Sequence, residues 1–394
     1  MSMLTSSVLQ MSIVWYITLK TGSAAVLSAA TLIAFVPQAI LGTFTGAYID
    51  RYNRKTVLIA ADLFIAFISL VLVISGYIGE ISIAFLLLLA GIRSIGAAFH
   101  YPTLQAITPM IVPKEYLTKY AGYAKGFESL SSIASPGIAI ALYALLRLNG
   151  VALFDVFGAL FAVFLLTFVK LPHKEPHNKT EKPHLLQEVR QGFSVIRHEP
   201  GMVPLMVIGA LYAIIYFPIG SYYPLITMTY FGGSVAASGL VETVFALGVL
   251  GGSLLLSIFG GKLSKRRMLI GSVFFYGACV FITGLLPSSG LIVFIGLSAV
   301  MGITIPFYSG VETAIFQTQI KEEYLGRVFS LSSSITMVAM PVGLILSGIF
   351  AQWLGVEKWF SILGALALLL AILSLRIPSL HSWDKTEEDF HNPS

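Results

Sequence analysis

The sequence predicts an all-α membrane protein with twelve transmembrane helices in two pseudo-symmetric six-helix bundles. Composition is the first sign, since 56% of the 394 residues are hydrophobic, only 11% are charged, and the mean hydropathy is +0.86. A soluble domain carries roughly 25% charged residues, which help to cover its surface. The second sign is a series of apolar segments, and the third is a likeness between the two halves of the chain.

A helix needs about twenty mostly apolar residues to cross a hydrocarbon core of ~30 Å. The first apolar segment is short and lacks a polar leader, which leaves two explanations open: a truncated start, or a helix that spans a thinned bilayer. The twelve segments are residues 2–19, 24–49, 56–76, 80–99, 120–145, 151–170, 201–223, 236–259, 268–286, 290–307, 328–353 and 356–375.

A hydrophilic stretch divides these segments six and six. Residues 171–200 are rich in Lys, His, Glu and Pro, which predicts a cytoplasmic linker. It would join an N-terminal bundle, residues 1–170, to a C-terminal bundle, residues 201–377. Residues 378–394 are polar, and we expect this tail to be cytoplasmic and mobile.

The Lys and Arg residues predict that both termini are cytoplasmic. If the loops after even-numbered helices and the tail face the cytoplasm, that side holds all but four of the 24 basic residues. The exceptions are Lys20, Arg147 and Lys358 on the opposite side, and Arg93 within a span. Cytoplasmic loops of membrane proteins collect positive charge. This rule also accounts for the net charge of +5 without a nucleic-acid partner.

The two halves share short sequences at matching places. The segment before the fifth helix resembles the segment before the eleventh, and Pro136 and Pro341 follow at similar distances. Two six-helix repeats that run in the same direction are typical of a large transporter class with its substrate site between the halves. The matching segments are Val112-Pro113-Lys114-Glu115-Tyr116-Leu117 and Ile320-Lys321-Glu322-Glu323-Tyr324-Leu325.

Residue patterns for enzyme or metal chemistry are missing from the sequence. Cys279 is the sole cysteine, and the seven His residues are dispersed outside the predicted spans without metal-ligand spacing. No Gly-x-x-x-x-Gly-Lys phosphate loop occurs, and the first apolar segment lacks a signal-peptide pattern. We therefore expect no enzyme, no bound metal and no cofactor.

The loop between the second and third helices carries a specific motif. It resembles the signature loop of the major facilitator superfamily, Gly-x-x-x-Asp-Arg-x-Gly-Arg-Arg/Lys. Asn53 replaces the second glycine, and because Asn tolerates the left-handed conformation we expect the tight turn to be kept. The motif reads Gly46-Ala47-Tyr48-Ile49-Asp50-Arg51-Tyr52-Asn53-Arg54-Lys55.

The resemblance implies a conformational latch at this loop, which would hold one of two access states. Asp50 would face the positive N-terminal end of another helix, and Asp62 in the third helix would belong to the same latch. The alternative is that the bases serve the positive-inside rule alone, although that rule gives no reason for Asp50 among them. The latch residues are Gly46, Asp50, Arg51, Arg54, Lys55 and Asp62.

Within that superfamily, the chain is similar to drug exporters of the macrolide-efflux type, in the drug:proton antiporter branch, a group that includes siderophore exporters. Helix five reads Ala134-Ser135-Pro136-Gly137, an incomplete form of the Gly-Pro-x-x-Gly run of antiporters, which puts strict antiport in question. The similarity rests on Thr21-Gly22-Ser23, Ala61-Asp62, Pro102-x-x-Gln105-Ala106, Val112-Pro113 with Leu117, Phe154-Asp155 and Gly326-Arg327-Val328-Phe329.

Charged residues inside spans are costly, so each is a candidate for function. Arg93 lies near the cytoplasmic end of the fourth predicted helix, and Glu128 lies at a similar depth in the fifth. The two would pair as a proton relay or as a static ion pair. Asp155 and Glu242 lie in the outer thirds of the sixth and eighth predicted helices, and both are further candidates for proton coupling. Glu242 is the stronger candidate of the two; the alternative is that its carboxyl group reaches interfacial water.

Aromatic side chains suggest a substrate route. Tyr212, Tyr216 and Tyr223 are spaced to share one face of helix seven, and helix one offers Gln10 and Trp15. Aromatic rings with polar tips suit large amphipathic or cationic molecules, although such residues are also common in spans and at membrane interfaces.

These features together predict a proton-coupled exporter of amphipathic drugs that works by alternating access. The alternative cargoes on the same fold are a siderophore or a lysophospholipid. The expected partners are a small amphipathic substrate, protons and the lipid bilayer, with the chain a monomer. By resemblance, the expected location is the bacterial cytoplasmic membrane.

Overall fold

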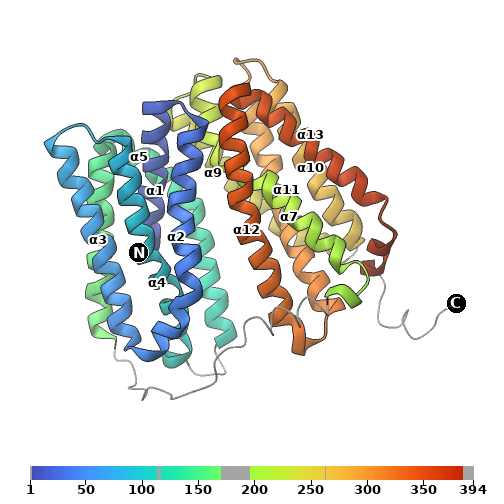
Figure 1. Ribbon diagram of the computed structural model, residues 1–394, viewed down its shortest axis with the longest axis horizontal. Coiled ribbons are helices and arrows are strands. Elements are labelled where there is room, and N and C mark those ends of the chain that lie inside the picture. Colours follow the sequence, from blue (N-terminus) through green and yellow to red (C-terminus); the bar gives the residue numbers. More distant parts are fainter. Residues whose placement is uncertain (1, 113–116, 170–195, 262, 385–394) are drawn as a thin grey trace. The chain divides into compact units, whose positions relative to one another are not determined.

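The computed structural model describes residues 2–112, 117–169, 196–261 and 263–384. The chain divides into two compact units, Met1–Thr180 and Glu181–Ser394, whose boundary falls within the predicted linker. Every regular element in the described part of the chain is helical (Figure 1). At a few helical positions only the backbone is described, which applies to Gly46, Asp50, Arg51 and Glu128. Most of the linker and the end of the tail lie outside the described residues.

The N-terminal unit contains five continuous helices that make six crossings. An α-helix rises 1.5 Å per residue, so the 52 residues of α5 would measure about 78 Å, far more than one crossing requires. Arg147 interrupts this helix with φ 53° and ψ −167° at the predicted boundary between the fifth and sixth spans. The helices are α1 Ser2–Thr21, α2 Ala24–Arg51, α3 Arg54–Ile78, α4 Ile83–Ile111 and α5 Leu117–Phe168.

From residue 202 to residue 384, the described part of the C-terminal unit contains six long helices and three short ones. With α5 counted once, eleven described helices are long and apolar enough to cross a membrane, so the break at Arg147 makes twelve crossings and confirms the prediction. The helices are α7 Met202–Ser221, α8 Tyr223–Leu225, η2 Ile226–Tyr230, α9 Val235–Phe259, α10 Lys265–Leu285, α11 Leu291–Gln319, α12 Glu322–Leu354, α13 Val356–Leu375 and η3 Pro378–Asp384.

The packing of helices repeats from one unit to the other. In the N-terminal unit α1 packs on α5, α2 on α4, and α3 on both α4 and α5. In the C-terminal unit α7 packs on α12, α9 on α11, and α10 on both α11 and α13. Because α12 and α13 correspond to the two parts of α5, each pair has its counterpart, as expected for two six-helix repeats.

Basic residues at the start of α3 and α10 hold the ends of neighbouring helices in the same way. Arg54 Nη1 donates to the Ala106 carbonyl in α4 at 2.7 Å, and Lys55 Nζ donates to the Thr167 and Val169 carbonyls at 3.0 and 2.7 Å. Such contacts suit the negative ends of helices.

The C-terminal unit repeats this arrangement at the start of α10. Lys265 Nζ donates to Thr318 Oγ1 in α11 at 2.8 Å, and Arg266 Nη2 donates to the Leu375 carbonyl at the end of α13 at 2.6 Å. In both units, therefore, two adjacent bases bind the fourth and sixth crossings.

The expected left-handed conformation of Asn53 is wrong. Its φ and ψ are −64° and 114°, and its side-chain oxygen accepts hydrogen bonds from the backbone N–H groups of Lys55 and Thr56 at 2.9 and 3.4 Å. Asn53 is thus the N-cap of α3, a role that Asn fills well and Gly cannot fill with a side chain. Ser264 caps α10 in the same way.

The tail is also more ordered than expected. Residues 378–384 form η3, in which Leu380 and Trp383 are fully buried. The Ser382 hydroxyl donates to the Pro200 carbonyl at 3.0 Å. Gly201, at φ 82°, leaves no room for a side chain, because an added Cβ would lie 2.6 Å from Trp383 Nε1. Two apolar anchors therefore dock this part of the tail beside the start of α7.

Close approach of α9 and α11 generates a prediction about stability. A Cβ on Gly302 of α11 would collide with the Phe245 carbonyl oxygen of α9, whereas a Cβ on Gly296 of the same helix meets nothing within 4 Å. Small residues let membrane helices approach closely. We expect Gly302→Ala to lower the midpoint of thermal unfolding in detergent by several degrees, and Gly296→Ala, the matched control, to leave it unchanged. Equal effects of the two substitutions would contradict this account of the packing.

Candidate functional site

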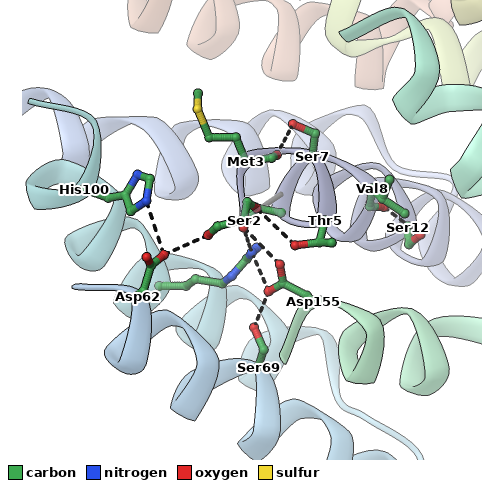
Figure 2. A network of polar contacts seen from close by, with 12 residues as sticks. Ser2, Met3, Thr5, Ser7, Val8, Ser12, Asp62, Ser69, His100 and Asp155 are labelled. Atoms are coloured by element: carbon green, nitrogen blue, oxygen red, sulfur yellow. Dashed lines mark hydrogen bonds and ion pairs between the residues drawn. The ribbon is translucent and has the colours of Figure 1, made fainter. Parts of the chain in front are cut away.

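A buried ion pair lies inside the N-terminal unit. Arg93 Nη2 in α4 is 2.8 Å from Asp155 Oδ2 in α5, and the side chains are 12% and 0% exposed. The Ser6 hydroxyl donates to Asp155 Oδ1 at 3.0 Å, and the Ser69 hydroxyl donates to Oδ2 at 2.7 Å. Arg93 Nη2 also donates to Ser6 Oγ at 2.8 Å. Residues from three other crossings thus converge on the Asp155 carboxylate; Figure 2 shows the contact from Ser69.

A second polar group lies on the same helices. Asp62 in α3 is 1% exposed; its Oδ1 accepts a hydrogen bond from the Ser2 hydroxyl at 2.8 Å and lies 3.2 Å from His100 Nε2 in α4. Figure 2 shows Ser2 and His100 approaching Asp62 from two sides. His100 is 12% exposed, so this pair is nearly as enclosed as the first.

The spacing of these residues explains why the two groups form together. Asp62 and Ser69 are seven residues apart on α3, and Arg93 and His100 are seven apart on α4, so each pair lies on one helix face about two turns apart. Helix α1 contributes Ser2 and Ser6, one turn apart on one face. We call the two groups together the N-unit polar network.

The structure bears on three expectations for the charged residues. The described ion-pair partner of Arg93 is Asp155 rather than Glu128, whose side chain lies outside the description. Arg93 was expected near the cytoplasmic end of its helix, but α4 continues to Ile111, which places Arg93 near the middle. Asp62 contacts the network rather than the motif loop, where Arg54 and Lys55 bind helix ends instead.

His100 corrects a further expectation, that every His lies outside the spans. It lies inside α4, which runs through Pro102 instead of ending before it. The helix-breaking tendency of Pro is tolerated in membrane helices when neighbours satisfy the freed carbonyl groups. Among the residues that the structure describes, no group of three or more His, Cys, Asp and Glu is placed to bind a metal ion.

A cluster of tyrosines lies inside the C-terminal unit. Tyr212 of α7 has its ring centroid 4.5 Å from that of Tyr308 in α11, 5.7 Å from Tyr276 in α10, and 5.8 Å from Tyr216 in α7. Tyr216 and Tyr276 are 5.6 Å apart. These separations are those of favourable aromatic pairs. We call these four residues the tyrosine cluster.

Polar atoms in this cluster lack partners. The hydroxyls of Tyr212 and Tyr308 are buried and, within the described part of the chain, make no hydrogen bond. Leaving a buried hydroxyl without a partner costs about 1–3 kcal/mol. Native proteins rarely accept this cost, so two such hydroxyls in one cluster call for an explanation.

A carboxyl group lies beside the cluster. Glu312 is one turn beyond Tyr308 on α11, and both polar groups approach Gly209 of α7. A Cβ on Gly209 would lie 3.2 Å from the Tyr308 hydroxyl and 3.6 Å from Glu312 Oε1. The glycine therefore gives the two polar groups room against α7. Glu312 makes no hydrogen bond or ion pair with another described residue.

Tyr223, the third tyrosine predicted on helix seven, does not continue that helix, because α7 ends at Ser221 and Tyr223 begins the separate helix α8, ahead of Pro224. Its phenol still interacts with those of Tyr216 and Tyr276. Its ring packs between Phe245 and Phe294, with ring centroids 5.7 Å away.

Helix α1 supplies one half-buried polar residue and one buried ring. Trp15 is fully buried and packs edge-on against Tyr143 of α5, with centroids 5.8 Å apart, and Gln10 is half-buried. In the other unit, Glu242 of α9 is half-buried and interacts electrostatically with the Tyr223 phenol. Trp15 thus stabilises the packing of α1, while Gln10 and Glu242 keep partial exposure.

In the tyrosine cluster and its neighbouring carboxyl group, the sequence did not indicate Tyr276, Tyr308 and Glu312. The predicted tenth span ended at residue 307, directly after Pro306, but α11 continues to Gln319. Continuing the helix would have placed Tyr308 and Glu312 on one face, since they are four residues apart. No sequence signal singled out Tyr276 in its apolar helix.

The fold and both sites define a polytopic membrane transporter, with polar groups enclosed among its spans and no catalytic arrangement among its described residues. The chain matches the Major Facilitator Superfamily over residues 1–232 and 205–393. It belongs to this family, as its motif loop and its two six-helix repeats also indicate.

Curated relatives extend this assignment. The chain is 43% identical over 383 residues to Macrolide efflux protein A of Streptococcus pyogenes, covering 97% of this chain and 95% of that protein. It is also 43% identical over 323 residues to Macrolide efflux protein A of Enterococcus faecalis, covering 82% of this chain and all of that one. Among solved structures, the nucleoside transporter NupG aligns over 96% of this chain and 99% of its own, with a TM-score of 0.71 and 12% identity, which supports the fold alone.

The buried ion pair generates a prediction about stability. Removing one partner of a buried pair leaves an uncompensated charge and costs about 3–5 kcal/mol, whereas apolar replacement of both partners is far better tolerated. We expect Asp155→Leu to reduce thermal stability in detergent strongly, and the double variant Arg93→Met with Asp155→Leu to recover most of the loss.

The control is Glu80→Gln, because Glu80 pairs with Lys20 at 3.1 Å but is 87% exposed, and it should unfold like the unchanged protein. A double variant no more stable than Asp155→Leu alone would contradict the compensating role of Asp155.

Proposed function

We propose that this chain exports macrolides or related amphipathic drugs from bacteria, driven by protons, through alternating access of its two six-helix units. The identity of 43% to Macrolide efflux protein A over nearly the whole length of both chains carries the proposal. Identity of this extent includes helices of both repeats, and so the regions that would contact cargo as well as the scaffold. The Lys and Arg distribution supports cytoplasmic termini in the cytoplasmic membrane.

The alternative cargoes receive no comparable support. No described feature favours a siderophore or a lysophospholipid. The likeness to solved transporters of other cargoes is at 12–17% identity and bears on the fold alone. We propose a monomer as the working unit, since each unit buries its own polar groups within itself.

For proton coupling, the N-unit polar network offers two carboxylates in different situations. Asp155 receives hydrogen bonds from Arg93, Ser6 and Ser69, so its negative charge is compensated from three sides. With its two oxygens engaged by three donors, this carboxylate is poorly placed to relay a proton. The Arg93–Asp155 pair therefore acts as a fixed positioning element.

The Asp62–His100 pair is better suited to exchange a proton. Imidazole is the ordinary side chain that gains and loses a proton between pH 5 and 8. His100 keeps some exposure and has an acceptor at 3.2 Å. The charged groups described near it are Asp62 on α3, Arg93 two turns away on α4, and Asp155 on α5. We place the proton site of this unit at Asp62–His100, with Glu128 and Glu242 as further candidates.

The latch at the motif loop stays part of the proposal. Arg54 and Lys55 hold the ends of α4 and α5 by hydrogen bonds to their carbonyl groups. A basic pair fixed in this way would move with its unit as one body, and Gly46, Asp50 and Arg51 complete the motif beside it. The described contacts of Asp62, the sixth residue predicted for the latch, belong to the N-unit polar network.

Efflux from cells tests the proposal. Cells that express the chain should accumulate less radiolabelled erythromycin than cells without it, and a protonophore should remove the difference. We expect His100→Asn and Asp62→Asn to lower the protonophore-sensitive efflux rate at least tenfold and to flatten its dependence on external pH between 5.5 and 8.5, because the exchanging group is gone.

Glu80→Gln is the control and should retain the rate and pH profile of the unchanged chain, since Glu80 is an exposed surface residue. An efflux rate that the protonophore leaves unchanged would rule out proton coupling. A normal pH profile in both His100→Asn and Asp62→Asn would move the proton site to another carboxyl group. If the protein is well expressed and inserted in the membrane but erythromycin is not exported, the proposed macrolide cargo is wrong.

A further inference from the structure

The tyrosine cluster and Glu312 have a feature that packing alone does not explain: they combine aromatic rings with polar groups that lack partners. Three helices, α7, α10 and α11, bring the four rings together. Tyrosines in a well-satisfied core direct their hydroxyls to an acceptor. Here the buried hydroxyls of Tyr212 and Tyr308 find none among the described residues.

The carboxyl group of this region also has no described base as its partner. Glu312 lies in α11 seven residues before the helix ends at Gln319, about 10 Å inside it. The described basic residues of the C-terminal unit lie in the first turns of helices or beyond helix ends, and none forms an ion pair with Glu312. A carboxyl group in a membrane span is costly and marks a functional site by default.

The geometry directs these groups to a common place. The Tyr308 hydroxyl and Glu312 Oε1 both face Gly209, the position where α7 has no side chain. Tyr212, one turn further along α7, packs against Tyr308 with ring centroids 4.5 Å apart and ring planes tilted by 35°. Tyr216 and Glu312 are half-buried rather than enclosed, so the group has an accessible side.

These properties match the recognition of an organic cation. A positive charge is attracted to the face of an aromatic ring within about 6 Å of its centroid, and more strongly where water is excluded. A carboxylate adds a counter-ion, and hydroxyl oxygens without partners accept hydrogen bonds from an ammonium N–H. A neutral amphipathic molecule would leave the Glu312 carboxyl group without a positively charged partner.

We propose that Tyr212, Tyr216, Tyr276, Tyr308 and Glu312 bind the protonated amine of the exported drug. This inference rests on the proposed function and specifies which chemical group of the cargo is recognised and where. Glu312 is the counter-ion of the ammonium group, the rings supply its surroundings, and Gly209 leaves the space in which the charged groups meet.

The test is equilibrium binding to the full-length chain, purified in detergent, with two probes of one skeleton. Erythromycin carries a dimethylamino group that is protonated at neutral pH, and its N-demethyl-N-acetyl derivative is neutral at the same position. We expect the unchanged protein to bind erythromycin at least tenfold more tightly than the derivative. Glu312→Gln should remove this preference while changing the affinity for the neutral derivative less than twofold.

Two variants keep the interpretation clear. Tyr308→Phe retains the ring and removes the hydroxyl, and should weaken erythromycin binding several-fold without affecting the derivative. Glu357→Gln is the matched control, because Glu357 lies in the first turn of α13, and it should leave both affinities unchanged.

The outcomes separate the site from the function. An equal loss of affinity for both probes in Glu312→Gln would indicate a structural role of Glu312 and overturn the proposed amine site. A persistent preference for erythromycin in that variant would overturn it too, while leaving the exporter proposal intact. Failure of the unchanged protein to bind either probe would contradict both proposals.

Discussion

Hydrocarbon offers no hydrogen-bond partner, so every polar group inside the two units must find its partner within the protein or in a ligand. This constraint accounts for most of the described contacts. Serine and threonine hydroxyls inside the helices donate to carbonyls three or four residues back. The carbonyl groups at the ends of α4, α5 and α13 receive hydrogen bonds from Arg54, Lys55 and Arg266.

The two units meet this constraint in different ways. In the N-terminal unit, Arg93 and Asp155 neutralise each other, and Ser6 and Ser69 occupy further acceptor sites of the carboxylate. In the C-terminal unit, the Tyr212 and Tyr308 hydroxyls and the Glu312 carboxyl have no such partners among the described residues. The same repeat has therefore produced one unit with a balanced interior and one with a carboxyl group that an external cation can balance.

The sequence predicts the helices well because the signal of a membrane span is strong. Apolar length located twelve crossings, and Arg147 breaks α5 at the expected boundary. The errors have one physical cause. Spans were ended at residues 99 and 307, before Pro102 and after Pro306, but both helices continue for about three turns. Neighbouring helices support the backbone around such prolines, and this support cannot be seen in a single segment.

That cause also explains which site residues were found. Arg93 and Asp155 stood out as charges within apolar runs, but their pairing depends on how α4 and α5 pack, which sequence spacing does not give. His100 and Glu312 lay just beyond the predicted ends of their helices. Asn53 was recognised as a departure from the motif, but its role as an N-cap required the direction of its side chain.

The central claim is that the C-terminal unit holds the cation that balances Glu312, while the N-terminal unit keeps its own charges paired. An experimental structure of the full chain with erythromycin bound tests this most directly. The account predicts the amine nitrogen within about 4 Å of the Glu312 carboxylate and about 6 Å of a ring of the tyrosine cluster, with Arg93 and Asp155 still paired. An amine placed beside Asp155 or Asp62, or exposed to water away from Glu312, would contradict it.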